Sequence, residues 1–260
     1  MMGALWTAAT GMRAQQTNID VISNNLANAN SFGYKKVRAE FKDLMYQTER
    51  EAGTPMQSGT QTPVGNQVGM GVWNSATNRM FSQGDFQQTQ NPLDLVIQGD
   101  GFFQIQQPDG SLAYTRDGSF KVDGDGQVVT SDGLLLVPNI QVPEGSTNLT
   151  ISPEGAVTAQ VGPNIQQIGQ LQIARFINPA GLTAQGNSLF TQTPASGEPV
   201  TATPDSNGVG SIKQGYIELS NVDTVEEMIN LIVAQRAYEA NSKSIQTSDN
   251  MLSIANNLQH

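Results

Sequence analysis

Residues 224–252, TVEEMINLIVAQRAYEANSKSIQTSDNML, carry a large side chain at every seventh position. The large side chains are Leu231, Tyr238, Ile245 and Leu252. A second set lies three positions after each of them: Ala234, Asn241, Ser248 and Ala255. Seven-residue spacing places such residues along one narrow side of an α-helix, which packs against a partner helix. The stretch therefore predicts a long helix that has a helical partner.

The partner is predicted at the other end of the chain. The same two sets recur there as Leu5, Met12, Ile19 and Leu26, and as Ala8, Gln15, Ile22 and Ala29. We expect helices over about 3–29 and 224–258. A capping box is expected at the start of the second helix. Two residue pairs have its spacing: Asp223 with Glu226, and Thr224 with Glu227. The two helices are expected to form a coiled coil.

This helical pair is expected to be too weak to stand alone. Only about eight sizeable side chains would be buried, at roughly 1.5–3 kcal/mol each. Ordering about sixty-five residues costs about 1–2 kcal/mol per residue before hydrogen bonds offset part of it. We therefore expect the ends to become ordered among copies of the chain, as in a polymer subunit. The polar residues predicted to fix the register are Asn24, Asn25, Asn28 and Asn241.

The composition excludes several classes of function. The 260 residues have a net charge of -10, which disfavours nucleic acid as a partner. The chain has no cysteine, and its one histidine is the last residue, His260, so a Ser-His or Cys-His catalytic unit is excluded. No catalytic, metal or cofactor residues are predicted. No apolar run is long enough to span a membrane, and residues 1–16 lack the features of a secretory signal peptide.

The middle of the chain predicts an antiparallel β domain over residues 93–220. Five Asp-Gly pairs, which supply the positive φ of tight hairpin turns, separate short apolar segments there: they begin at Asp109, Asp117, Asp123, Asp125 and Asp132. The terminal helical domain is assigned to 1–33 and 221–260, and 34–92 to a connecting segment. Residues 34–46 fit a short helix or an extended segment, and 47–71 a linker or an extended hairpin.

Three weaker motifs are interpreted as structural. Residues 123–127, DGDGQ, resemble a calcium loop, but Val128 stands where the loop needs glycine, so we expect a turn. Residues 99–101, GDG, begin a dinucleotide pattern that Gln104 breaks, which favours close backbone packing. A glycosidase pair of carboxylates is not excluded, although no local sequence indicates one.

Four segments resemble the bacterial flagellar rod and hook proteins. They are SNNLANANSFGYK from Ser23, DLVIQGDGFFQI from Asp94, YTRDGSFKVDGDGQVVTSDG from Tyr114, and QGYIELSNVDTVEEMINLIVAQRAYEANSKSIQTSDNML from Gln214. They follow the family's order and span nearly the whole chain. The length of the chain and the stretch from Tyr46 to Pro63 indicate the distal rod branch, with another rod paralogue as the alternative.

The resemblance implies a structural protein that is mainly β with α: a β-rich outer domain, and an inner coiled coil of both termini lining a central channel. It implies helical polymerisation into a hollow drive shaft, with interface residues in the two seven-residue repeats. It also implies a stiffening arm at about 46–63, including Tyr46, Gln47, Pro55 and Pro63.

The implied partners are other copies of the chain, proximal rod proteins, the hook protein, the surrounding P- and L-ring proteins and the flagellar type III export apparatus. The implied location is the basal-body rod crossing the periplasm, reached without a cleaved signal peptide. Two alternatives from other classes are a peptidoglycan hydrolase, which would need two convergent carboxylates, and a soluble binding module with termini ordered in the monomer.

Overall fold

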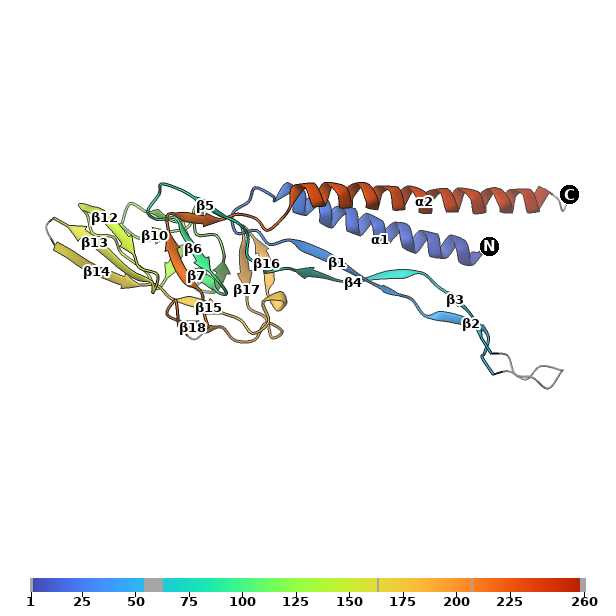
Figure 1. The fold of residues 1–260 in the computed structure, drawn as a ribbon, viewed down its shortest axis with the longest axis horizontal. Helices are drawn as coiled ribbons and strands as arrows, with labels where there is room; N and C mark the ends of the chain where they lie inside the picture. Colours follow the sequence, from blue (N-terminus) through green and yellow to red (C-terminus); the bar gives the residue numbers. More distant parts are fainter. Residues whose placement is uncertain (1, 54–62, 163, 207, 258–260) are drawn as a thin grey trace. The chain divides into compact units, whose positions relative to one another are not determined.

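The computed structural model describes residues 2–53, 63–162, 164–206 and 208–257 (Figure 1). These residues divide into two compact units. The first contains the described residues of 1–27, 37–78 and 223–260, and the second those of 28–36 and 79–222. The structure confirms the predicted class, because two terminal helices pack together and the remainder is antiparallel β structure.

The first unit is built on helices α1 (Met2–Ala27) and α2 (Thr224–Asn257), which lie side by side (Figure 1). Asp223 is the N-cap of α2: its carboxylate accepts hydrogen bonds from the backbone N–H groups of Val225 at 2.8 Å and Glu226 at 3.1 Å. Of the two capping-box registers, the structure thus uses the one that starts at Asp223. Helix α1 ends two residues before the predicted Ala29, in a turn through Asn28.

Two pairs of strands complete the first unit. Strand β1 (Val37–Asp43) pairs with β4 (Val72–Arg79), and β2 (Tyr46–Arg50) pairs antiparallel with β3 (Asn66–Gly69). Of the two conformations considered for 34–46, the extended one is present. Residues 47–71 form an extended hairpin in their described part. We call β2 and β3 the arm.

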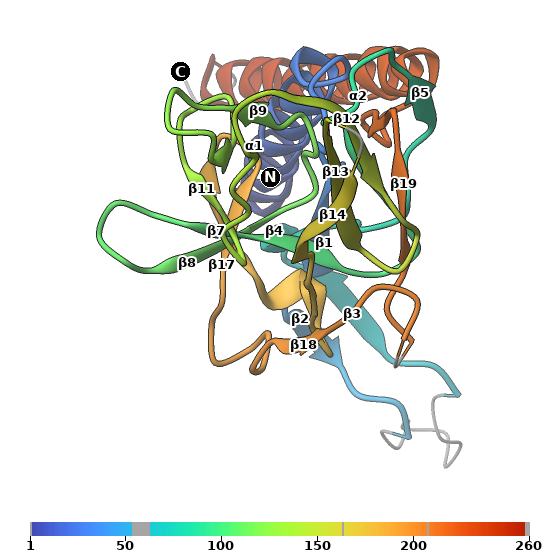
Figure 2. The ribbon, with the colours of Figure 1, turned by 90° about the vertical axis from the view of Figure 1, so that its left-hand side faces the viewer.

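The second unit consists of four sheets. The largest has the order β16-β17-β8-β7-β11-β10-β9, with β15 joining both β7 and β18. A three-stranded sheet, β12-β13-β14, and the pairs β19-β6 and β20-β5 complete it; β12, β13 and β14 lie together in Figures 1 and 2.

The strands of the second unit are short. Their bounds are β5 (Phe86–Gln88), β6 (Leu95–Gln98), β7 (Phe102–Gln106), β8 (Leu112–Thr115), β9 (Lys121–Val122), β10 (Val128–Val129), β11 (Leu135–Val137), β12 (Ser146–Ile151), β13 (Ala156–Val161), β14 (Asn164–Gln170), β15 (Ile173–Arg175), β16 (Thr183–Gly186), β17 (Leu189–Thr191), β18 (Val200–Ala202), β19 (Ser211–Gln214) and β20 (Tyr216–Glu218). One 3-10 turn, η1 (Pro179–Gly181), precedes β16.

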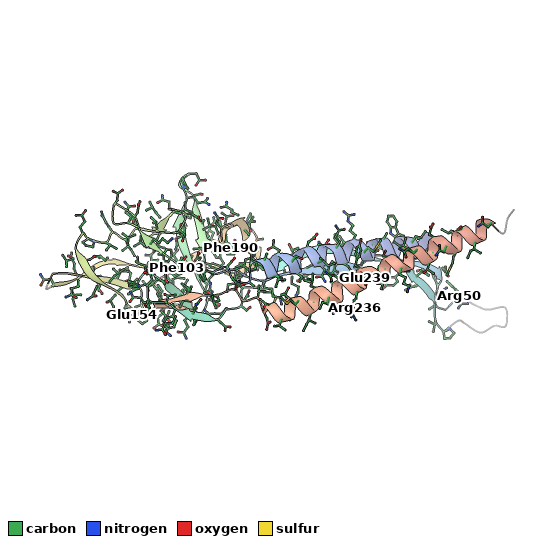
Figure 3. All side chains as sticks on the ribbon, turned by 90° about the horizontal axis from the view of Figure 1, so that it is seen from above. Arg50, Phe103, Glu154, Phe190, Arg236 and Glu239 are labelled. Carbon is green, nitrogen blue, oxygen red and sulfur yellow. The ribbon has the colours of Figure 1, made fainter. Side chains whose placement is uncertain are left out.

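The core of the second unit forms around β7, whose successive side chains face two apolar clusters. Phe103 packs edge-on against Phe120, with ring centroids 5.1 Å apart. On the other side, Phe102 packs against Phe176 and Phe190, at 5.8 and 6.1 Å. Figure 3 shows Phe103 and Phe190 inside this unit. A strand buried on both faces explains the uninterrupted apolar sequence there.

The Asp-Gly prediction is correct for three of its five glycines. Gly110, Gly126 and Gly133 have φ of 84°, 78° and 79°. Gly118 and Gly124 do not have positive φ, so the prediction is wrong for these two. Gly118 has a different role, because any Cβ there would overlap the carbonyl oxygen of Leu95.

Close backbone packing explains the GDG sequence at 99–101. Gly99 has φ of 113°, and a Cβ there would lie 3.1 Å from the Cα of Gly210. Gly101 has φ of 143° and would overlap Ile173 if it had a Cβ. The structural interpretation of this motif is confirmed.

The two units cut across the boundaries expected from the sequence. Residues 34–36 and 79–92 belong to the second unit, and 37–78 fold with the helices instead of forming a separate connection. Strand pairing is the physical reason, because β5 pairs with β20 whereas β1 lies against α1.

Candidate functional site

The paired terminal helices are the candidate functional site. The predicted repeat residues of α1, namely Leu5, Met12, Ile19 and Leu26, are all partly buried. On α2, Leu231, Ile245 and Leu252 are partly buried, whereas Tyr238 is 39% exposed. The most deeply buried apolar residues of the pair are small or β-branched: Ala8, Ala14, Ile22 and Ala234. The side of α2 that carries the repeat thus faces α1 of the same chain.

A glycine sets a close approach between the helices. A Cβ at Gly11 of α1 would lie 3.0 Å from the side-chain amide nitrogen of Asn241 on α2. Asn241 is partly buried, as expected for a polar residue inside the seam. Any side chain at position 11 must therefore displace Asn241.

This contact makes a testable prediction for the helix pair. Gly11→Val should lower the free energy of unfolding by about 1–3 kcal/mol, because it overfills a tight contact. Gly3→Val makes the same change on the same helix, where nothing lies within 4 Å, and should change stability by less than about 0.5 kcal/mol. Urea unfolding followed by far-UV circular dichroism measures both, and equal losses would contradict the predicted contact.

Asn25 is the most deeply buried of the four predicted register residues. It is 1% exposed, and its amide donates to the carbonyl oxygen of Val37 at 2.8 Å and to Glu227 Oε2 at 3.2 Å. Its own carbonyl accepts from the Val37 N–H at 2.9 Å. One side chain therefore connects α1, α2 and the start of β1.

The other two register residues lie differently. Asn24 is exposed, and Asn28 is partly buried and accepts a hydrogen bond from the hydroxyl of Ser31 at 3.2 Å. Asn28 belongs to the second unit, so the residues predicted as one group are divided between the two units.

The sequence indicated Glu227 only as a possible capping-box partner of Thr224, and its burial between the helices was not predicted. This carboxylate is 1% exposed and hydrogen bonds to Asn25. A signal was present, because Glu227 lies seven residues before Ala234 and thus extends the seam by one position. A charged residue at an apolar position was not recognised as part of the pattern.

The arm lies beside the first turns of α1. The predicted arm residues Tyr46, Gln47 and Pro63 are exposed, and Pro55 lies outside the described residues. The hydroxyl of Thr10 on α1 approaches the arm's base and accepts from the N–H of Val72 at 3.3 Å. The neighbouring Gly71 has φ of 111°, and a Cβ there would overlap this hydroxyl.

A cluster of three charged side chains is buried in the second unit. Glu218 is 1% exposed; its Oε1 lies 2.6 Å from Lys35 Nζ and its Oε2 lies 3.3 Å from Arg116 Nη1. Lys35 also donates to the carbonyl oxygen of Ser82 at 2.7 Å, and Arg116 to that of Gly99 at 2.8 Å. The N–H of Gly84 donates to Glu218 at 3.0 Å. We call Lys35, Arg116 and Glu218 the charge triad.

Burial dominates the electrostatics of the charge triad. Desolvation lowers the pKa of Lys35, and attraction to Glu218 opposes this effect only in part. Burial likewise lowers the pKa of Arg116, again against the attraction of Glu218. Lys35, Arg116 and Glu218 come from three of the four segments that resembled the rod and hook proteins. Their convergence could not be predicted from the sequence.

Metal-ligating side chains do not gather among the described residues. No group of three or more His, Cys, Asp or Glu side chains among them could hold a metal ion. Residues 123–127 include a turn closed by a hydrogen bond from the Gly126 N–H to the Asp123 carbonyl oxygen at 2.9 Å. Neither described helix combines the length and the apolar content that crossing a bilayer requires.

Comparison with known proteins identifies the family of this chain. Residues 5–35 match the family model of the flagella basal body rod protein, 96–159 that of the flagellar hook protein FlgE/F/G D1 domain, and 213–258 that of the flagellar basal body rod FlgEFG protein C-terminal. The flagellar basal-body rod protein FlgG of Borreliella burgdorferi is 55% identical over 99% of both chains. The chain belongs to the FlgE/F/G family of flagellar rod and hook proteins.

Other FlgG proteins are similarly related. That of Agrobacterium fabrum is 51% identical over 97% of this chain and 98% of its own, and that of Bacillus subtilis is 38% identical over 99% of both. The chain is accordingly a structural subunit of the flagellar distal rod and has its role in motility. All three segments matched by family models overlap the segments of the sequence that resemble rod and hook proteins.

Proposed function

We propose that this rod subunit polymerises helically into a hollow, rigid shaft that transmits torque from the motor to the hook and encloses the export channel. The observation that carries the proposal is the paired terminal helices, which keep large apolar side chains exposed. Trp6 on α1 is 59% exposed, and Val225 and Ile254 on α2 are 65% and 61% exposed. Apolar groups left open on a helix pair favour burial by neighbouring copies.

The proposed partners are further copies of the chain, the proximal rod proteins, the hook protein, the P- and L-ring proteins and the type III export apparatus. The proposed location is the rod crossing the periplasm, after export without a cleaved signal peptide. The arm is proposed to lie between subunits and stiffen the shaft, since Tyr46 and Val68 in the arm are 54% and 46% exposed and Met45, just before it, is 87% exposed. We propose no enzymatic activity.

Electron microscopy of the concentrated, purified chain tests this proposal. Straight tubes are expected, and their number should rise with protein concentration. Curved tubes would contradict the stiffening role of the arm. A chain that forms no tubes or oligomers at any concentration would contradict the polymer itself, and muramidase activity in the same sample would favour the hydrolase alternative.

Assembly is expected to depend on the helix pair. Ile245→Asp and Leu252→Asp each place a charge at a partly buried position of α2 and should abolish tubes, because an unpaired charge there prevents close helix packing. The second unit should stay folded, as judged by near-UV circular dichroism. Gln246→Asp puts the same charge on an exposed position of α2 and should preserve the tubes. Normal assembly by the two seam variants would refute this dependence.

A further inference from the structure

The first turns of α2 have apolar residues on two opposite faces. One face carries Leu231 and Ala234 and packs against α1. The other carries five side chains that are each more than half exposed: Val225, Met228, Ile229, Ile232 and Val233. At 100° per residue, the centres of the two sets lie about half a turn apart. We call the exposed set the α2 ridge. A helix that is apolar all round is normally buried all round.

The α2 ridge is short and has charged ends. Asp223 and Glu226 are exposed where it begins. Arg236 and Glu239, labelled on α2 in Figure 3, are the next exposed residues on the same side. Beyond them this side carries the polar residues Lys243 and Asn250, and large exposed apolar residues return only at Met251 and Ile254, near the end of the helix. A compact apolar patch bounded by charges is typical of a protein interaction surface.

A complementary cleft lies in the same unit, between the start of α1 and the arm. Its volume is about 970 Å³. Its lining on the α1 side runs from Gly3 to Ala9 and includes the exposed Trp6. The arm contributes Gln47, Glu49, Val68 and Gly69, and Met70 follows directly after it. We call it the α1–arm cleft. Small residues such as Gly3 and Ala4 leave room in it for larger side chains.

One copy cannot fill its own cleft with its own ridge. Along the helix pair the ridge lies level with the end of α1, because Glu227, on the opposite face of the same turns, hydrogen bonds to Asn25. The cleft lies beside Gly3–Ala9, at the beginning of α1. About nineteen residues of helix separate the two, which is about 28 Å at 1.5 Å per residue. A parallel second copy shifted by this distance brings its ridge to the cleft.

We propose that the α2 ridge of one copy occupies the α1–arm cleft of the next. The inference rests on the proposed polymer and names the surfaces that make it. The ridge spans about 12 Å and the α1 wall of the cleft about 9 Å, at the standard helical rise. Arg236 ends the ridge and Glu49 lines the cleft, so opposite charges meet at the edge of the contact.

This contact joins two different surfaces of the same chain. Each copy can therefore bind one neighbour through its ridge and another through its cleft. When the rotation between successive copies does not close into a ring, such head-to-tail contacts build a helical filament. It also gives the arm a role, because the arm forms one wall of the site into which the neighbour fits.

Cysteine cross-linking tests the contact directly, because the chain has no cysteine of its own. Ala4→Cys, in the cleft, and Ile232→Cys, on the ridge, are made in separate full-length chains, mixed in equal amounts, assembled and then oxidised. Disulfide-linked dimers of the two chains are expected in the assembled fraction and not in dilute monomer. Asn250→Cys, on the same side of α2 beyond the ridge, replaces Ile232→Cys as the matched control and should give no such product.

A charge substitution provides an independent readout. Ile232→Asp should raise the critical concentration for assembly about tenfold or more and leave the far-UV circular dichroism of the monomer unchanged, whereas Asn250→Asp should change neither. If the wild-type chain forms tubes but the yield of cross-linked dimer does not exceed that of the control, the proposed ridge–cleft contact is wrong, whereas the proposed polymer is not contradicted. Normal tubes from Ile232→Asp would overturn it as well. A wild-type chain that never oligomerises overturns both proposals.

Discussion

Replacing Glu218 with glutamine should lower the free energy of unfolding by about 3–5 kcal/mol, the typical cost of removing one partner from a buried ion pair. Glu218 is the only carboxylate within ion-pair distance of Lys35 and Arg116 among the described residues. Its neutralisation leaves two buried cations facing each other, in surroundings that already lower the pKa of both. The second unit should therefore unfold at markedly lower urea concentration.

Lys35→Met is the informative counterpart of this substitution. It removes one of the two cations and leaves Arg116 paired with Glu218, so the remaining buried charges balance. Its cost should be clearly smaller than that of Glu218→Gln, even though the hydrogen bond to Ser82 is lost. Glu154→Gln, an exposed change in the same unit (Figure 3), should have almost no effect. Urea unfolding monitored by near-UV circular dichroism compares the three, and a larger loss for Lys35→Met would contradict this account.

The second large effect is expected at Asn25. Asn25→Ala should cost about 2–4 kcal/mol, because each buried polar group left without a partner costs about 1–3 kcal/mol. The substitution removes both hydrogen bonds to the backbone of Val37 and the one to the buried carboxylate of Glu227. The helix pair and β1 should loosen together, since the same side chain joins them.

The measurement is urea unfolding followed by the helical signal in the far UV, supported by hydrogen exchange of α1 and α2. Asn250→Ala makes the same chemical change at an exposed position of α2 and is the matched control. It should alter stability by less than about 0.5 kcal/mol. If the two variants unfold alike, Asn25 is not the connection that the hydrogen bonds indicate.

Local patterns in the sequence were sufficient for the class of fold. The spacing of Leu5 to Leu26 and of Leu231 to Leu252 predicted both terminal helices and their pairing, because helical periodicity is written into consecutive residues. Asp223 marked the start of α2 for the same reason, since a cap contacts only its own first turn. The turns at Gly110, Gly126 and Gly133 were equally local. The resemblance to rod and hook proteins carried the function.

Contacts between distant residues had to come from the tertiary structure. The charge triad joins positions 35, 116 and 218, and no spacing rule links them. Gly118 is explained by the carbonyl oxygen of Leu95, and Glu227 is buried because Asn25 of the other helix is there to bind it. The membership of 37–78 in the helical unit likewise depends on strand pairing.

The two faces of α2 show most clearly the difference between what local sequence predicts and what tertiary contacts decide. The sequence by itself predicted a helix over about residues 224–258 with an apolar seam, because the period of a helix is a property of its own backbone. It could not show that the partner helix covers the seam and leaves Val225, Ile229 and Ile232 exposed. Only the tertiary structure decided this, because exposure depends on which groups from elsewhere in the chain lie within contact distance.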